Sequence, residues 1–191
     1  ADGGYMWDGV MIDITSQKNL ENQLKVFATL DGLTNIYNRR YFLYLLIELL
    51  ADADLADKPF SVAIVDVDHF KSVNDNYGHS CGDTVLAEMG KFFAEFFADK
   101  GLIGRLGGEE FGVFLVGRSR FEATQIFEDF KNKVNNHPIR YMQSEIRITI
   151  SCGLYCGSFT KQTLLTDILK KADAALYRAK NTGRNRVVVY D

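Results

Sequence analysis

Acidic side chains gather at the ends of two apolar segments of this sequence, where they are unexpected. Asp66 and Asp68 close the run SVAIVDVD, and Glu109 and Glu110 follow the glycine pair of RLGGEEF. Acidic residues are depleted in β-strands, and carboxylates at the end of a buried strand are costly unless a cation meets them. Mg²⁺ suits such a position, because it prefers hard oxygen ligands and usually combines one or two carboxylates with substrate phosphates.

The spacing of the acids fits a shared metal site if the two segments lie side by side. Asp66 and Asp68 are two residues apart, so on an extended chain they point to the same side. Glu109 would then form with Asp66 a carboxylate pair able to hold one or two metal ions against a triphosphate. The alternative is that the acids are solvated strand ends. One acidic pair alone favours that alternative, whereas two acidic clusters at the ends of adjacent strands favour the metal.

Basic residues occur where phosphate groups would need them. Lys71 follows the first acidic pair, and AKNTGRNR carries Lys180, Arg184 and Arg186 around the end of a helix. Arg and Lys used together favour phosphate recognition. Basic residues are also common at helix C-termini for electrostatic reasons alone, so these cations support a phosphate site only in combination with the acids.

Two further polar candidates, Asn74 and Asp83, lie in the loop and helix start that follow the first acidic pair. The simplest role for Asp83 is the N-cap of the following helix, and that role is compatible with ligand binding. The glycine pair has its own explanation. Gly107 and Gly108 predict a two-residue hairpin turn, in which both central positions need a positive φ.

The remaining pattern predicts the elements that position these residues. The run at 61–67 is short and continuously apolar, typical of a strand buried on both faces. Further strands are expected at 5–15, 102–116 (as the hairpin), 146–151 and 186–190, and helices at 16–30, 41–50 with Asn38 as N-cap, 84–97, 121–135 and 164–180. Because a hairpin is mixed with strand–helix units, we expect an α+β fold whose sheet is covered by helices on one face.

The helix expected at 16–30 carries a narrow apolar stripe of Leu20, Leu24 and Phe27. Such a stripe suits a linker helix that pairs with a second copy of itself. A lone helix packed on its own domain explains the stripe equally well, and the sequence leaves both interpretations open.

Composition sets the outer limits. The chain has 191 residues, 47% of them hydrophobic and 25% charged, which allows one soluble domain with a short appendage. A net charge of −3 gives no electrostatic surface for wrapping nucleic acid. The three cysteines include no CxxC pair, and the segment CGLYC reads as a strand, so reduced thiols in the cytoplasm are favoured over a zinc site.

No apolar run approaches the ~20 residues of a membrane span. The chain starts at Ala1 without an initiator methionine or a leader, so we expect a piece of a longer protein. We therefore expect the chain to be cytoplasmic, with any sensory or membrane-anchoring part upstream.

Taken together, these residues resemble the GGDEF family, the diguanylate cyclases that join two GTP molecules into cyclic di-GMP. The resemblance covers roughly residues 30–190. DGLTNIYNRR resembles the opening signature of the family, DVDHFKSVNDNYGHSCGDTVL its metal and guanine segment, RLGGEEF its name motif in the GGEEF form, and ADAALYRAKNTGRNRV its closing segment.

The resemblance implies a fold and a set of site residues. The fold is a palm-like central sheet (ferredoxin- or nucleotidyl-cyclase-like), mixed and mainly antiparallel, flanked by helices. Mg²⁺, or Mn²⁺ in its place, would be held by Asp66, Glu109 and the main-chain oxygen of Val67. Glu109 is also the implied general base for the 3′-hydroxyl, with Glu110 as a helper. The implied substrate-binding residues are Asn74 and Asp83 for guanine, Lys71, Lys180, Arg184 and the backbone of His69 and Phe70 for the phosphates, and Gly107 and Gly108 for close approach of the backbone.

The same resemblance implies the reaction and the partners. Two GTP molecules condense into cyclic di-GMP and two pyrophosphates, and because one domain holds one GTP, two domains must face each other in a homodimer. Residues 1–15 resemble the last strand of a PAS sensor domain, residues 16–30 the signalling helix that follows it, and 31–191 the catalytic domain.

Two alternatives and one departure accompany this interpretation. The chain could be a catalytically silent GGDEF module that binds GTP and acts in regulation or dimerisation, or a cyclase that makes an adenine-containing dinucleotide. Asp83 argues against the second, because specificity rests on such polar contacts. Many members carry an Arg-x-x-Asp product-inhibition site, but here Ala98 and Gly101 occupy those two positions, so we expect no feedback inhibition through that site.

Overall fold

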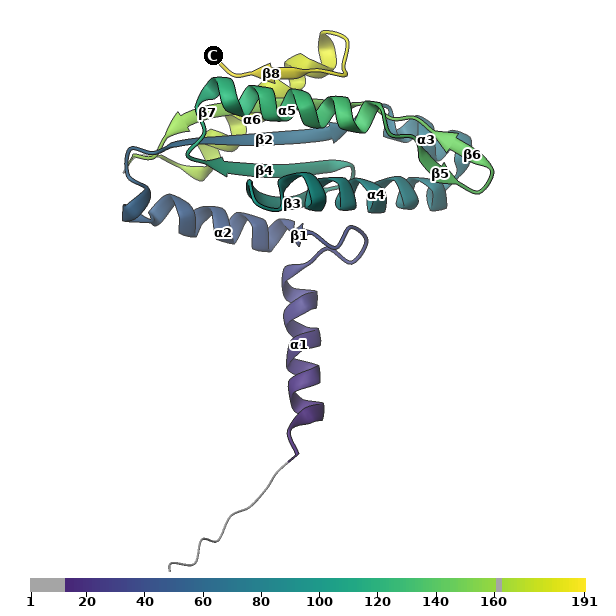
Figure 1. Cartoon of the computed structure of the whole chain (residues 1–191), viewed down its shortest axis with the longest axis horizontal. Coiled ribbons are helices and arrows are strands. Elements are labelled where there is room, and N and C mark those ends of the chain that lie inside the picture. Colours follow the sequence, from purple (N-terminus) through teal and green to yellow (C-terminus); the bar gives the residue numbers. More distant parts are fainter. Residues whose placement is uncertain (1–12, 161–162) are drawn as a thin grey trace, which may run out of the picture.

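A six-stranded sheet forms the centre of the computed structural model, which describes residues 13–160 and 163–191 (Figure 1). Across the sheet the strands follow the order β1 (Tyr37–Asn38), β3 (Gly101–Gly107), β4 (Glu110–Val116), β2 (Pro59–Val67), β7 (Ile150–Ser158) and β8 (Val187–Val189). The two outermost pairs, β1–β3 and β7–β8, are parallel, and the three inner pairs are antiparallel. The expected α+β class with a mixed, mainly antiparallel sheet is therefore confirmed.

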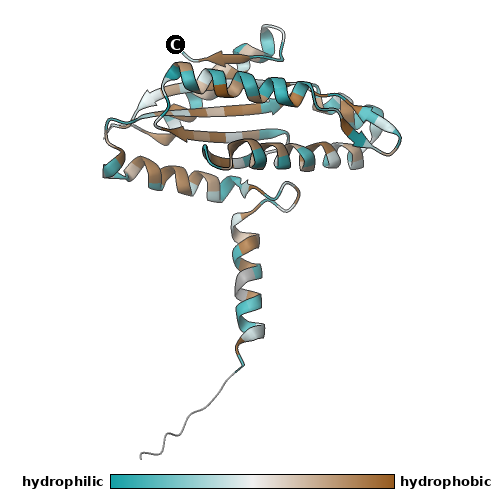
Figure 2. Ribbon diagram, in the orientation of Figure 1, coloured by the Kyte–Doolittle hydropathy of each residue, from teal (hydrophilic) through white to brown (hydrophobic). Residues whose placement is uncertain are grey.

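Strand β2 is central because its sequence is apolar on both faces. One set of its side chains, Phe60, Val62 and Ile64, packs with α2 (Arg39–Ala51) and α6 (Leu165–Asn181). The alternate set, Ala63, Val65 and Val67, packs with α4 (His79–Phe97) and α5 (Arg120–Asn135). Helices thus cover both faces of the sheet, and the expectation of one covered face was wrong. Figure 2 shows the sheet strands as mostly hydrophobic, with hydrophilic colour on the covering helices.

Stacked phenylalanines join one helical layer to the sheet. The ring of Phe93 in α4 lies 4.7 Å from that of Phe111 in β4 and 4.6 Å from that of Phe130 in α5. Phe111 directly follows the acidic pair of the hairpin, so this packing fixes the start of β4 against the core.

The predicted boundaries hold best where a strong local signal exists. Asn38 caps α2 as expected, because its side chain accepts a hydrogen bond from the backbone N–H of Tyr41 at 3.0 Å. The expected strand 146–151 was misplaced: Ser144–Ile146 form β6, which pairs with β5 (Ile139–Tyr141), and β7 begins at Ile150. The expected polar loop after β2 contains a further helix, α3 (Phe70–Tyr77), of which only Phe70 and Val73 are buried.

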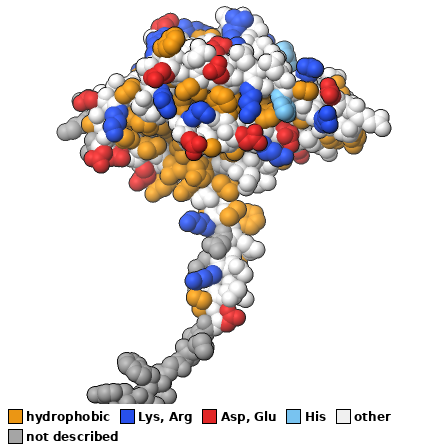
Figure 3. All heavy atoms as spheres, in the orientation of Figure 1, with side chains coloured by type: hydrophobic (Ala, Val, Ile, Leu, Met, Phe, Trp, Pro, Cys, Tyr) orange, Lys and Arg blue, Asp and Glu red, His pale blue; other side chains and the backbone are white. Residues whose placement is uncertain are grey.

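Helix α1 (Thr15–Thr29) projects away from the sheet and its covering helices (Figure 1). Leu20, Leu24 and Phe27 are 57%, 61% and 82% exposed, and Figure 3 shows hydrophobic side chains along this projecting helix. The stripe therefore does not pack on its own domain, and its pairing with a second copy stays a prediction. The strand expected at 5–15 falls mostly on residues 1–12, outside the described part, and the helix already begins at Thr15.

Within residues 13–160 and 163–191, none of the helices has the length and apolar character needed to span a membrane.

Truncating the central phenylalanine of the stack tests this packing. Phe93→Ala should lower the free energy of unfolding by about 3–5 kcal/mol, because it removes a fully buried ring and leaves a cavity. Urea denaturation measures this value. Phe121→Ala is the control, since that ring is 78% exposed and its loss should change stability by no more than about 0.5 kcal/mol. Equal losses of unfolding free energy in the two variants would contradict the packing of Phe93 in the core.

Candidate functional site

The turn of the β3–β4 hairpin lies one residue later in the sequence than predicted, at residues 108–109 instead of 107–108. Both glycines have positive φ, 143° at Gly107 and 52° at Gly108. Gly107 pairs with Glu110 across the hairpin, so Gly108 and Glu109 form the turn, and an irregularity between Arg105 and Gly107 absorbs the shift. Glu110, not Glu109, therefore begins the returning strand. A side chain at either glycine would meet nothing within 4 Å, so the backbone conformation is the reason for glycine here.

The two acidic segments lie on neighbouring strands. Asp66 at the end of β2 is in register with Glu110 of β4, and the backbone N–H of Val67 donates to the carbonyl of Glu109 at 3.3 Å. Asp66 is only 5% exposed, whereas Glu109 and Glu110 are half-buried. The fold thus gathers carboxylates from two distant parts of the sequence at one edge of the hairpin.

Asp66 is a buried carboxylate with a shortage of positive charge around it. Its pKa is raised from 3.8 to about 6, mainly because the carboxylate is buried. The ammonium of Lys180 opposes this rise through a 2.7 Å hydrogen bond, and repulsion from Glu109 and Glu110 contributes to it. Such a group gains from any additional cation. Within the described residues no three His, Cys, Asp or Glu side chains form a ready metal cluster, so a metal ion here would also need main-chain or substrate oxygens.

Asp68 has a different role from Asp66. It accepts hydrogen bonds from the hydroxyls of Thr149 at 2.7 Å and Ser151 at 2.6 Å, and from the backbone N–H of Asn185 at 3.0 Å. Neutral donors therefore saturate this buried carboxylate. Through Asn185 it anchors the loop after α6, a role that the sequence analysis missed. The available signal was the Thr-x-Ser alternation at the start of β7.

Three predicted phosphate-binding positions begin α3, directly after the acidic end of β2. His69 has a φ of 57° and is the residue before the helix, and Phe70 and Lys71 form its first turn. Backbone N–H groups at a helix N-terminus favour anions. Lys71 is exposed and Phe70 is buried, so the ring anchors the turn while the lysine stays free to reach solvent or a ligand.

Asn74 and Asp83 lie on two adjoining helices, α3 and α4, and Gly82 lets the side chain of Asn74 approach the backbone of α4. A Cβ atom at residue 82 would stand 2.0 Å from Oδ1 of Asn74, so the amide of Asn74 lies against the backbone of α4 next to Asp83. The expected N-cap role of Asp83 was wrong, because α4 begins at His79 and Gly78 is the residue before it. Gly82 was not among the predicted site residues.

The loop after α6 holds the remaining cations. Lys180 lies in the last turn of α6, and the backbone N–H of Arg184 donates to the carbonyl of Ala179 at 3.0 Å. Arg184 has a φ of 59°, a conformation held by this bond and by the Asp68 contact one residue later. Ala98 ends α4 and Gly101 begins β3, at the far end of that strand from the hairpin turn.

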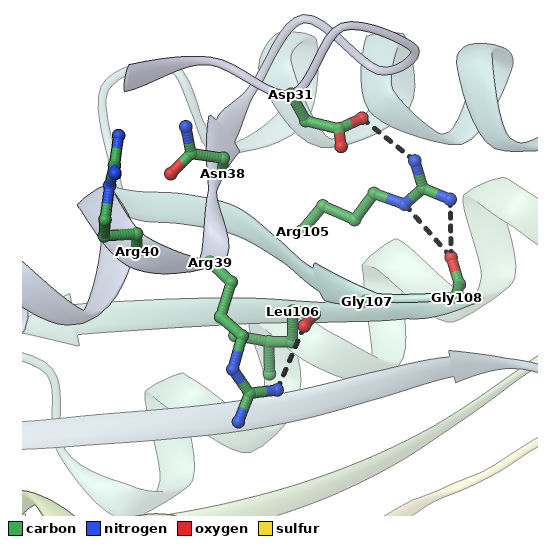
Figure 4. Close-up of a pocket in the computed structure, with 8 residues that line it drawn as sticks. All are labelled: Asp31, Asn38, Arg39, Arg40, Arg105, Leu106, Gly107 and Gly108. Carbon is green, nitrogen blue, oxygen red and sulfur yellow. Dashed lines mark hydrogen bonds and ion pairs between the residues drawn. The ribbon is translucent and has the colours of Figure 1, made fainter. Parts of the chain in front are cut away.

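An arginine-rich pocket of about 510 Å³ borders the hairpin on the side of α1 and α2 (Figure 4). The guanidinium of Arg105 donates twice to the carbonyl of Gly108, at 3.0 and 2.8 Å, and once to Asp31 at 3.0 Å. Arg39 donates to the carbonyl of Leu106 at 3.0 Å. These contacts tie the hairpin to the segment that follows α1, and sequence analysis did not anticipate them.

Comparison with known proteins identifies the family. The model of the family described as "Diguanylate cyclase, GGDEF domain" matches residues 28–186. The chain belongs to this family. The chain is 35% identical over 181 residues to the probable diguanylate cyclase DgcF of Escherichia coli K12, covering 93% of this chain. It is 34% identical over 183 residues to a diguanylate cyclase of Vibrio cholerae serotype O1, covering 95% of this chain.

The chain spans 56% of the length of each of these two relatives. Among solved structures, the coiled coil and GGDEF domain of DgcB from Caulobacter crescentus, in complex with c-di-GMP, is similar to it with a TM-score of 0.84. That similarity covers 92% of this chain and 93% of the other at 28% identity. The fold of the GGDEF domain, including a helix before the sheet, is therefore shared with that protein.

The raised pKa of Asp66 predicts an unusual pH dependence of the metal-free protein. Between about pH 4 and 6 the folded state binds more protons at Asp66 than the unfolded state does. The contribution of this group to the free energy of unfolding therefore falls as the pH rises through that window, and is constant above it. Asp66→Asn should lack this fall, so it should gain stability relative to the native chain from pH 4 to 6.

Urea denaturation at a series of pH values, with a chelator present, measures this difference. Asp99→Asn removes an exposed acid and should leave the pH dependence unchanged. A difference between the native chain and Asp66→Asn that stays constant from pH 4 to 6 would contradict the shift.

Proposed function

We propose that the chain is the catalytic domain of a diguanylate cyclase, which condenses two GTP molecules into cyclic di-GMP and two pyrophosphates. The observation that carries the proposal is the buried carboxylate of Asp66 beside Glu109 and Glu110 at the turn of the hairpin. Membership of the GGDEF family supports it.

The residues at the end of β2 fit a magnesium ion, or a manganese ion in its place. Asp66, Glu109 and the main-chain oxygen of Val67 would hold it, all hard oxygen donors of the kind that Mg²⁺ prefers. When bound, the ion neutralises phosphate charge and so lowers the barrier to attack on the α-phosphorus. The excess negative charge around Asp66 is the structural reason to expect a cation here.

The remaining catalytic task of the chain is to position two nucleotides. Lys71, Lys180 and Arg184 bind the phosphates, assisted by the backbone N–H groups of His69 and Phe70 at the start of α3. Gly107 and Gly108 leave open space beside the turn, which lets the nucleotide lie against the backbone.

Proton transfer completes the reaction. Glu109 accepts the proton of the 3′-hydroxyl of one GTP, with Glu110 as its neighbour. The 3′-oxygen forms a bond to the α-phosphorus of the other GTP, and the bond from that phosphorus to the pyrophosphate group breaks. The same step with the roles exchanged closes the ring.

Guanine recognition falls to Asn74 and Asp83. The carboxylate of Asp83 accepts from N1–H and the amino group of guanine, which adenine cannot match, so GTP is preferred over ATP. Asn74 lies against the backbone of α4 at Gly82, the residue before Asp83.

Catalysis requires a homodimer, because each domain holds one GTP. The exposed stripe of α1 is the proposed pairing surface of the linker helix. A sensory domain of the PAS type before residue 16 would set the arrangement of the two helices.

Glu109→Gln should lower the rate of cyclic di-GMP formation at least about 100-fold, because the amide cannot accept the proton. The measurement is incubation of the native chain with GTP and Mg²⁺, with two pyrophosphates expected per cyclic di-GMP. Specific activity should rise with protein concentration as dimers form. Glu95→Gln, on the exposed face of α4, is the control and should keep full activity. Nucleotide binding without pyrophosphate release by the native chain would favour the silent module instead.

Gly82→Ala should weaken binding of a non-hydrolysable GTP analogue about tenfold without unfolding the chain. The new Cβ would displace the amide of Asn74, whereas an alanine in a helix is itself more favourable than glycine by up to about 1 kcal/mol. Calorimetric titration and urea denaturation separate the two effects. Ser80→Ala, exposed in the same helix, should change neither. Unaltered affinity in Gly82→Ala would remove Asn74 from the guanine site.

Cyclic di-GMP should not bind tightly at the turn between α4 and β3. Ala98 and Gly101 offer neither the guanidinium nor the carboxylate of the product-inhibition site. Titration of cyclic di-GMP into the nucleotide-free protein, followed by backbone NMR, should show no saturable shifts at residues 98–101. Saturable, tight binding centred on these residues would refute the expectation.

A further inference from the structure

The ammonium of Lys180 is paired with Asp66, the buried carboxylate of the proposed metal site. Its Nζ lies 2.7 Å from Oδ2 of Asp66. The Asp66 side chain is 7% exposed, so few other partners can reach it, whereas the Lys180 side chain is 31% exposed at the end of α6. A buried acid is thus paired with a lysine that retains a way out to solvent.

A metal ion and this lysine compete for the carboxylate of Asp66. Mg²⁺ binds its oxygen ligands at roughly 2.0–2.1 Å, closer than the ammonium now lies, and two cations on one carboxylate repel each other. A buried acid left without any partner is also unfavourable. Metal binding therefore weakens the pairing of Asp66 with Lys180, and that pairing weakens metal binding.

Phosphate groups bound beside Arg184 would offer the ammonium of Lys180 a second partner. Lys180 sits in the last turn of α6, four residues before Arg184, which lies in the loop that Asp68 anchors through Asn185. A lysine side chain is a flexible four-carbon stem with a compact charge. Rotation of that stem can carry the ammonium from Asp66 toward phosphates bound beside Arg184.

We propose that Lys180 is the resident counterion of Asp66 and exchanges with the divalent ion, moving onto the phosphates when metal and GTP bind. The proposal rests on the metal site of the proposed function. It assigns Lys180 two successive partners and couples the loading of metal to that of nucleotide. In the empty protein the lysine prevents an unpaired buried charge; in the loaded protein it contributes charge to the triphosphate.

The exchange has a measurable effect on metal affinity. If the lysine-paired state is about nine-tenths populated, the metal-competent fraction is about one-tenth and the apparent dissociation constant for metal alone is raised about tenfold. Lys180→Met should therefore bind Mn²⁺ about tenfold more tightly than the native chain in the absence of nucleotide, although it should bind the GTP analogue more weakly. Electron paramagnetic resonance of free Mn²⁺ measures the Mn²⁺ affinity.

Lys133→Met is the matched control, because it removes a lysine that pairs with Glu95 on the opposite helical layer. It should leave Mn²⁺ affinity unchanged. Equal Mn²⁺ affinity in the native chain and Lys180→Met would overturn the exchange.

Removal of a positive charge could tighten metal binding by weaker repulsion alone, so a second measurement follows Lys180 itself. Acetylation by an amine-reactive ester, quantified at each lysine by mass spectrometry, reports whether the ammonium is paired. Saturating Mn²⁺ alone should raise labelling of Lys180 several-fold, and addition of the GTP analogue should lower it again. Lys133 in the same sample should not respond. Labelling of Lys180 that does not change at saturating Mn²⁺ would refute the proposal.

Asp66→Asn separates this proposal from the one on which it rests. One outcome is that Asp66→Asn loses Mn²⁺ binding while the labelling of Lys180 in the native chain does not respond to Mn²⁺. That outcome would keep the metal site and reject the exchange. Mn²⁺ binding by Asp66→Asn equal to that of the native chain would reject the metal site and the exchange with it.

Discussion

The organisation of this domain depends on the electrostatic demand of one buried carboxylate. Asp66 lies near the end of the buried strand β2, where desolvation and two neighbouring glutamates oppose its charge, and Lys180 compensates only part of that cost. Three elements surround it. The β3–β4 hairpin supplies the two glutamates, α6 supplies the ammonium of Lys180, and α3 begins just after the same end of β2. A charge so poorly compensated is unfavourable for folding and suited to binding a cation.

Two kinds of acid at the end of β2 show how position decides role. Asp66 faces charged groups, whereas Asp68 is surrounded by two hydroxyls and a main-chain N–H. The first arrangement leaves the carboxylate responsive to ligands. The second holds the loop of Arg184 and Asn185, both in the left-handed region, in one conformation.

Sequence reasoning succeeded where the signal is local. The cap at Asn38, the doubly buried strand β2 and the positive φ of the glycine pair follow from residue types over a few positions, and all three are present in the structure. It failed where tertiary packing decides. Helix α3 is short and mostly exposed, so it reads as a loop, and the single-residue shift at Leu106 that moves Glu109 into the turn has no sequence signature. Gly82 and Arg105 act through contacts with distant residues, which spacing alone does not reveal.

The contacts of Arg105 extend the folded domain to a residue before its first strand. Asp31 precedes the sheet in sequence, yet it shares this side chain with the carbonyl of Gly108. A shortened chain that began after Asp31 would retain every strand but would leave Arg105 without its acidic partner and the turn of the hairpin less firmly held. The segment that follows α1 and the turn of the hairpin are thus linked across 74 residues of sequence through the side chain of Arg105.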